Sequence, residues 1–171
     1  LKLLKVDLFK DEIFVFTPAG DVTPLPAHST PIDFAFQVHT QVGMHCMGAK
    51  VNGNIVPLNS ILKNGDSVEI LTSKTQKPSY AWLKIVQTGK AKSHIKRWVK
   101  KEQTKQSIQL GKEIIEKTLR RMKQESIIKE LHSRPQSIGY NEIEMVYSAL
   151  ANGQLTVRDI IEKYQSVDVE E

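Results

Sequence analysis

Three side chains that could act as metal ligands or nucleophiles lie close together in the sequence: His39, His45 and Cys46. Their spacing matches no standard metal site, and the sequence has neither a His-Asp doublet nor an H-E-x-x-H motif. A Cys-His pair could serve as nucleophile and base, but no third group is visible that would orient it. The glycine-rich loops G-x-G-x-x-G and G-x-x-x-x-G-K-[ST] are absent as well. We therefore predict no catalytic centre, no metal site and no cofactor in this chain.

A dense run of basic residues between positions 76 and 123 is the strongest chemical signal. This segment holds fourteen Lys and Arg against three Glu, a net charge of +11, whereas the whole chain carries +5. On a helix, Lys92, Lys96 and Lys100 form one row and Arg97 and Lys101 form a second. Like charges this close repel each other unless a polyanion neutralises them, so we predict that these five side chains bind RNA phosphates. The alternative is a merely solvated helix face, or one that answers the acidic last third of the chain.

His39 has two interpretations. On a helix it shares an apolar arc with Phe34, Val38 and Val42, which is typical of a core histidine whose ring nitrogens bond the backbone. If the end of that helix lies at the rim of a sheet, the ring could instead stack on an unpaired base or donate to a ribose or phosphate. Cys46 is predicted to be a small buried thiol next to the start of a strand.

The elements that must position these residues begin with a small sheet. The turn sequences P-A-G-D, N-G-N and N-G-D separate runs rich in Val, Ile, Phe and Thr, which predicts strands at 13–17, 22–25, 48–51, 55–58 and 67–71. Between the second and third strands, Ser29 or Thr30 can cap a helix that begins at Pro31, runs to about Val42 and ends at Gly43. This order of elements is that of a β-grasp, a twisted sheet curled over one helix.

After Ser73 the hydrophobic spacing becomes helical. Ile95, Trp98 and Val99 lie at i, i+3 and i+4, and the same face is expected to continue through Leu110, Ile114, Ile115, Leu119 and Met122. Further helices are predicted over Ile143–Leu150 and from a capping box at Thr156–Asp159 through Tyr164. Trp82 and Trp98 are expected to be packing anchors rather than base-stacking residues. The predicted fold class is α+β, with an all-α domain after the β-grasp.

Composition limits the setting in which the chain works. It has 171 residues, of which 40% are hydrophobic and 25% charged, as in ordinary globular proteins. A single cysteine excludes an intrachain disulfide and points to a reducing, cytoplasmic location. No stretch approaches the ~18–20 apolar residues that span a bilayer, so no membrane partner is expected. Because the chain does not begin with Met, we expect it to be a piece of a longer protein.

Several motifs make the chain similar to one known family. They are D-E-I-F-V-F-T-P-A-G-D at 11–21, S-T-P-I-D-F-A at 29–35, G-A-K-V-N-G at 48–53, G-D-S-V-E-I-L-T-S at 65–73 and A-K-S-H-I-K-R-W at 91–98. The first four resemble the TGS domain of the RelA/SpoT family, the long stringent-response factors that make or hydrolyse (p)ppGpp. The last motif and residues 146–160 resemble the helical domain that follows it in the family. The resemblance implies the tail of a preceding linker or helix at 1–10, a TGS domain at 11–75 and a helical domain at 76–171, basic in its first half and acidic in its last part.

This resemblance implies a regulatory role rather than a catalytic one. In the family, the hydrolase and the synthetase (GTP pyrophosphokinase) domains precede the TGS domain, and neither of their motifs occurs in this chain. The family's TGS domain contacts the 3′ CCA end of a deacylated tRNA on the stalled ribosome, and the histidine associated with that contact aligns with His39. The implied partners are therefore deacylated tRNA and the ribosome, and the implied role is to sense the tRNA end and to signal to the catalytic domains.

Two protein partners stay open as alternatives. The β-grasp could bind acyl carrier protein, as TGS regions of some family members do, and this acidic partner would also suit the basic segment. The basic helix could instead dock on acidic surfaces of the protein's own catalytic domains. Binding that survives RNase would favour acyl carrier protein, whereas salt-sensitive activity without RNA would favour docking within the protein.

Overall fold

A computed structural model describes residues 11–167, so the predicted tail at 1–10 and the acidic end at 168–171 lie outside the described residues. The chain divides into two compact units, Leu1–Lys100 and Lys101–Glu171. The first contains all five strands, and the second is built from helices. The predicted α+β class, a β-grasp followed by a helical region, is confirmed. Among the described helices, none is both long enough and apolar enough to cross a bilayer.

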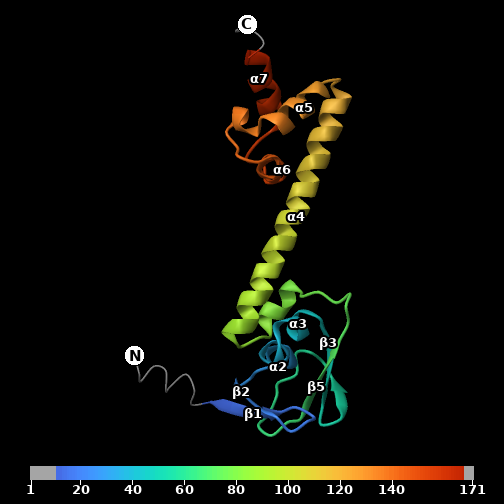
Figure 1. Ribbon diagram of the computed structural model, residues 1–171, viewed down its shortest axis with the longest axis vertical. Helices are drawn as coiled ribbons and strands as arrows, with labels where there is room; N and C mark the ends of the chain where they lie inside the picture. The colour runs from blue at the N-terminus through green and yellow to red at the C-terminus, as the bar shows by residue number, and fades with distance from the viewer. Residues whose placement is uncertain (1–10, 168–171) are drawn as a thin grey trace, which may run out of the picture. The chain divides into compact units, whose positions relative to one another are not determined.

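The strands of the first unit pair as a β-grasp sheet (Figure 1). β1 (Glu12–Phe16) and β2 (Val22–Pro26) form an antiparallel hairpin, and β3 (Cys46–Val51) pairs antiparallel with both β4 (Asn54–Val56) and β5 (Val68–Thr72). A parallel bridge between Phe16 and Ser67 joins β1 to the chain entering β5. The Phe16 N–H strengthens this junction by donating to the Asp66 carbonyl at 2.8 Å. All five predicted strands are confirmed, although β4 ends two residues earlier than expected.

One side of the sheet and one helix enclose the first core. Alternation along β1 and β2 turns Val15 and Leu25 inward, while Phe14 and Val22 remain about half exposed. Val15, Leu25, Phe34, Leu62 and Val68 are each at most 2% exposed. Burying a side chain of this size contributes about 1.5–3 kcal/mol, so the cluster holds the sheet against the helix.

The single helix predicted over 31–42 is in fact two helices, so that prediction was wrong. α2 (Pro31–Val38) and α3 (Thr40–Met44) are separated by His39, whose backbone is extended with φ −166°. The predicted end at Gly43 was also wrong, because Gly43 lies within α3, where the Phe36 ring occupies the space that a Cβ would need. Apolar spacing could not reveal the break, because it is made by one side chain that caps a backbone N–H. This hydrogen bond leaves the apolar positions before and after His39 unchanged.

Residues that follow the sheet complete the first unit. η1 (Tyr80–Lys84), the segment after it and the beginning of α4 (Gly89–Arg121) supply Trp82, Val86, Ala91 and Ile95 to a second buried cluster. Their partners from the β-grasp are Ile32, Ala35, Phe36 and Cys46. Trp82, 7% exposed, is a packing anchor as predicted. The β-grasp therefore shares a core with the chain up to about Lys100.

The second unit packs the later part of α4 with α5 (Ser126–Ser133), η2 (Pro135–Ile138), α6 (Ile143–Ala151) and α7 (Val157–Val167). Its centre is formed by Ile115, Leu119, Leu131, Val146 and Ile160, all at most 1% exposed. The predicted capping box that begins α7 is confirmed: the Thr156 N–H donates to Asp159 Oδ2 at 3.0 Å and the Asp159 N–H to Thr156 Oγ1 at 3.1 Å.

Leu110 of α4 and Met122, which directly follows α4, do not lie where the hydrophobic spacing placed them. Leu110 and Met122 were expected on the buried face, but they are 50% and 49% exposed, so that expectation was wrong. The row that enters the core is Gly111, Ile115 and Leu119, which repeats every four residues. Leu110 and Met122 fall beside this row. A glycine leads it because a Cβ at position 111 would overlap the main-chain carbonyl of Tyr147.

Candidate nucleic-acid interface

His39 is solvent exposed at the break between α2 and α3. Its backbone N–H donates to the Ala35 carbonyl at 3.2 Å and closes α2. Its side-chain Nδ1 accepts the Gln41 N–H at 3.0 Å and caps α3. In the neutral ring the proton then lies on Nε2, for which the described residues provide no hydrogen-bond partner. The imidazole is thus held in one orientation with a donor and a flat face available to a ligand.

A small open pocket of about 250 Å³ begins two residues beyond His39. Its lining is formed by α3 and the end of β5: Gln41, Val42, His45, Thr72, Ser73 and Lys74. The wall is fixed by two hydrogen bonds, from the Ser73 N–H to the His45 carbonyl at 3.0 Å and between His45 Nδ1 and the Gln76 carbonyl at 2.9 Å. Sequence reasoning missed this pocket because its two sides are about 30 residues apart in the chain. The surface that lines the pocket is mostly apolar, and Lys74 is among the lining residues.

The five predicted phosphate-binding residues all lie on α4. Lys96, Arg97, Lys100 and Lys101 are exposed, and Lys92 is half-buried. Among the described residues, no ion pair engages Lys96, Arg97 or Lys101. Ile95 is fully buried on the opposite face, as the spacing predicted, and Trp98 and Val99 are half-buried. His39 lies on a different element of the same compact unit as Lys92, Lys96, Arg97 and Lys100, while Lys101 begins the second unit.

Asp33 forms hydrogen bonds with distant residues, which the sequence did not reveal. Its carboxylate is completely buried and accepts the Thr30 N–H at 3.0 Å, as expected for a residue in the first turn of α2. It also accepts the Gln87 N–H at 3.0 Å, the Thr88 N–H at 2.9 Å and the Thr88 hydroxyl at 2.8 Å. Thr88 Oγ1 in turn accepts the Ala91 N–H at 3.2 Å, which caps α4. One carboxylate therefore serves both the N-terminus of α2 and the two residues that precede α4, which lie 54 and 55 positions away from Asp33.

The candidate ligands considered for metal or thiol chemistry are not grouped. Cys46 is fully buried at the start of β3, as predicted, and burial raises the pKa of its thiol to about 11. His45 is tied to the Gln76 carbonyl, and His39 caps α3. Within residues 11–167, no three His, Cys, Asp or Glu side chains are arranged to hold a metal ion.

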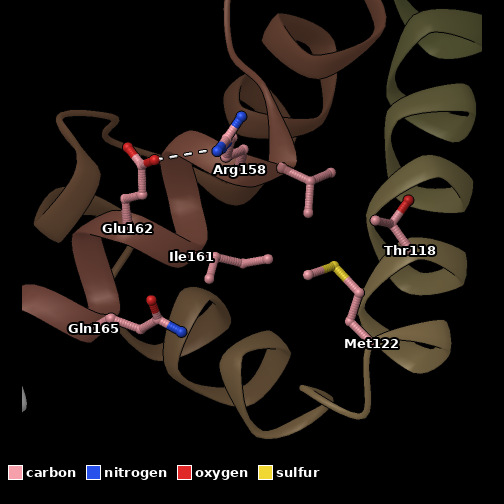
Figure 2. Close-up of a pocket in the computed structure, with 7 residues that line it drawn as sticks. Thr118, Met122, Arg158, Ile161, Glu162 and Gln165 are labelled. Carbon is pink, nitrogen blue, oxygen red and sulfur yellow. Dashed lines mark ion pairs between the residues drawn. The ribbon is translucent and has the colours of Figure 1, made fainter.

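The second unit carries a larger pocket of about 460 Å³ between the end of α4 and α7. Figure 2 shows Met122, the residue directly after α4, pointing toward Ile161 of α7, with Arg158 and Glu162 joined by an ion pair of 3.5 Å. Both partners of that pair are well exposed, so it adds little to stability. The surface that lines this pocket is mainly apolar, and the pocket offers no group of converging polar side chains that could perform chemistry.

Comparison with known proteins gives two family matches along the chain. Residues 13–72 match the TGS domain, and residues 98–165 match the RelA/SpoT AH domain. The TGS match covers the β-grasp, and the AH match covers most of α4 and all the helices after it.

Three longer relatives each align with most of this chain. A guanosine-3′,5′-bis(diphosphate) 3′-pyrophosphohydrolase of Aquifex aeolicus is 41% identical over 94% of this chain, and a GTP pyrophosphokinase of Streptomyces coelicolor is 39% identical over 95% of it. A GTP pyrophosphokinase of Myxococcus xanthus is 53% identical over 71% of the chain. The aligned part is 23%, 20% and 16% of these relatives, respectively, so the chain spans about a fifth of their length. The chain belongs to the RelA/SpoT family and contains its TGS and AH domains.

Proposed function

We propose that this chain is the non-catalytic regulatory region of a (p)ppGpp synthetase or hydrolase, and that it senses the 3′ CCA end of a deacylated tRNA on the ribosome. The names of the relatives support the parent activity. The observation that carries the sensing role is the position of His39, which is exposed at a helix break with its ring oriented and Nε2 available. A side chain buried in the core could not have met a nucleotide.

Recognition of the tRNA end rests on His39 and the adjacent pocket. The imidazole stacks on an unpaired base or donates from Nε2 to a phosphate or ribose oxygen. The terminal ribose occupies the pocket beside Gln41, where Lys74 contributes a positive charge to the lining. An amino acid esterified to that ribose adds bulk and an ammonium group, which Lys74 repels. Discrimination between charged and uncharged tRNA then needs no chemical step.

The exposed basic residues of α4 supply the sequence-independent part of the binding. Each Lys or Arg that neutralises a phosphate releases condensed counterions, so affinity falls with salt with a slope of about −0.7 to −0.9 per contact. Lys96, Arg97 and Lys101 are not held in ion pairs in the described part of the chain, so they are available for this role. Engagement of both sites on one RNA would shift the catalytic domains between states, which is a coupling between distant sites.

Replacing His39 by Asn tests the proposal, because Asn keeps a side-chain oxygen that can cap α3 while it removes the aromatic ring. We expect His39→Asn to weaken binding of deacylated tRNA by about ten-fold or more, as expected for a lost stacking contact. The preference for deacylated over aminoacylated tRNA should fall together with this affinity. His28→Asn is the matched control, since His28 is exposed on a turn with φ 69°, a backbone conformation that Asn tolerates. Equal affinity for the two tRNA forms in the unmodified protein would refute the proposal.

An acidic protein partner, either acyl carrier protein or the protein's own catalytic domains, would use the same exposed basic face. The charge-reversed variant Lys96→Glu with Arg97→Glu separates these possibilities. If the face binds RNA, the variant lowers the salt dependence of tRNA binding by roughly two phosphate contacts. Capture of acyl carrier protein that resists RNase and is lost in the variant would favour a protein partner instead.

A further inference from the structure

α2 is attached to α4 at two places within the first unit. Near its N-terminus, Asp33 accepts the backbone N–H groups of Gln87 and Thr88 and the hydroxyl of Thr88. One helical turn later, the Phe36 ring stacks on His94 of α4, with ring centroids 5.8 Å apart and planes inclined by 9°. His39 follows Phe36 by three residues, and Lys96 follows His94 by two. The helix that ends at the exposed imidazole is therefore pinned to the first turns of the basic helix.

Asp33 is more than an ordinary helix cap. A cap needs only the Thr30 N–H, which Asp33 accepts within α2 itself, as Asp159 does for the Thr156 N–H in α7. The additional bonds reach 54 and 55 residues along the chain and are fully enclosed, since Asp33 is 0% exposed. No side-chain polar atom in the described part of the chain is left buried without a partner, so this junction is fully satisfied. Buried polar junctions of this kind define one arrangement and disfavour others.

We propose that Asp33 is a positioning residue that joins the His39 site and three basic residues of α4 that lie in the first unit, Lys92, Lys96 and Arg97, into one rigid recognition surface for a single RNA. This inference rests on the proposed function. When two contacts lie on one rigid body, binding at the first places the second at a high effective concentration, and the affinity for a ligand that spans both exceeds that of either part. If the junction loosens, each contact persists, but the gain in affinity that comes from joining the two contacts declines.

Asp33→Asn is the variant that opens the junction. An amide has one oxygen where the carboxylate has two, so its NH2 group would face either the Thr30 N–H or the donors of Gln87 and Thr88, and one side of the junction would lose its acceptor. The expected result is a loss of about ten-fold or more in affinity for deacylated tRNA, because the effective concentration falls. Affinities for two single-site probes should stay within about two-fold: a CCA trinucleotide, which reaches only His39, and an RNA duplex without a 3′ overhang, which reaches only the basic face.

Asp159→Asn serves as the matched control. Asp159 makes the same local capping box in the second unit but has no recorded bond to a distant helix among the described residues. It should leave tRNA binding unchanged. If Asp33→Asn does not fold, Thr88→Val and His94→Ala carry the test, and far-ultraviolet circular dichroism verifies that they fold. Thr88→Val weakens the first attachment by removing its hydroxyl bond to Asp33 while the backbone bonds stay, and His94→Ala removes the second.

The outcomes separate this inference from the proposed function. Loss of tRNA affinity with both probes unaffected supports the positioning role. An equal loss for tRNA and both probes would show that Asp33 only maintains the fold, and an unchanged tRNA affinity in a folded variant would show that the junction is irrelevant; either result overturns the inference while leaving the proposed function standing. If the unmodified full-length protein does not prefer deacylated tRNA, the proposed function fails first and this inference fails with it.

Discussion

His39 interrupts the helix because its ring replaces a missing backbone partner. A helix that starts at Thr40 leaves its first N–H groups without carbonyl partners, and Nδ1 of His39 satisfies the one on Gln41. The same bond orients the ring and selects the Nε2–H tautomer. One residue thus couples local structure to the candidate contact, because the bond that caps α3 also presents the donor.

Cys46 differs from the exposed His39 because its side chain is fully buried. It is 0% exposed, and burial raises the pKa of its thiol from 9.0 to about 11, with only a backbone hydrogen bond at Gly48 acting in the other direction. At pH 8 the thiolate fraction is then about a hundred-fold lower than for a free cysteine. The raised pKa also means that the contribution of Cys46 to stability is complete below pH 9 and declines as the pH rises toward 11.

We therefore expect Cys46 to be inert toward a disulfide reagent such as 5,5′-dithiobis(2-nitrobenzoate) at pH 8 in the native protein. In a denaturing concentration of urea it should react with the stoichiometry of one thiol per chain. The absorbance of the released thiolate measures both rates. Rapid labelling without denaturant, at a rate close to that in urea, would contradict the burial of this thiol.

At the scale of elements, α4 carries three tasks along one helix. Its first turns bury Ala91 and Ile95 in the first unit, its exposed residues provide the basic face, and its later turns bury Ile115 and Leu119 in the second unit. Gly111 marks the place where the helix approaches α6 most closely, since the main-chain carbonyl of Tyr147 occupies the position of its missing Cβ. A backbone obstacle cannot rotate away as the end of a flexible side chain can.

Gly111→Ala should therefore destabilise the second unit by about 1–3 kcal/mol, as expected for overpacking. This outcome opposes intrinsic helix propensity, which favours Ala over Gly by about 1 kcal/mol. Urea unfolding followed by circular dichroism measures the change in the free energy of unfolding.

Gly89→Ala on the same helix is the matched control. Nothing lies within 4 Å of the Cβ that it would add, so this substitution should be neutral or slightly stabilising. Should Gly111→Ala stabilise the chain as much as Gly89→Ala does, the close approach of α4 and α6 would be disproved.

At the scale of the whole molecule, the strand-based domain and the compact unit do not end at the same place. The TGS match ends at residue 72, but the first unit extends to Lys100, because Trp82, Val86 and Ile95 share a core with Ile32 and Phe36. The buried carboxylate of Asp33 likewise finds most of its hydrogen-bond donors at Gln87 and Thr88. A β-grasp cut at its last strand would lose both.

A truncated chain of residues 1–75 should accordingly be less stable than one of residues 1–105. Losing the cover from three large apolar side chains costs roughly 3–6 kcal/mol by area, a large part of a small domain's stability. Midpoints of urea unfolding for the two truncated chains, followed by circular dichroism, measure the difference. Equal midpoints would show that residues 76–100 contribute nothing to the stability of the β-grasp.

The sequence alone determined the parts of this protein that depend on neighbours in the chain. Turn sequences and alternating residues located the five strands, and the density of Lys and Arg located the basic face of α4. A Ser or Thr cap before Pro31 located the start of α2, and the T-x-x-D box at 156–159 located the start of α7. Each of these signals lies within a few residues, where backbone geometry and side-chain periodicity act directly. The resemblance, carried by short motifs, singled out His39.

Only the tertiary structure decided whether His39 meets solvent, where the pocket beside it lies and what Asp33 binds. The break at His39 follows from one hydrogen bond that leaves the apolar pattern unchanged, so periodicity placed the ring among core residues. The pocket joins α3 to the end of β5, and Asp33 reaches residues 54 and 55 positions away. Such contacts arise from how the elements pack, because distance along the chain says nothing of distance in space once the chain has folded back on itself.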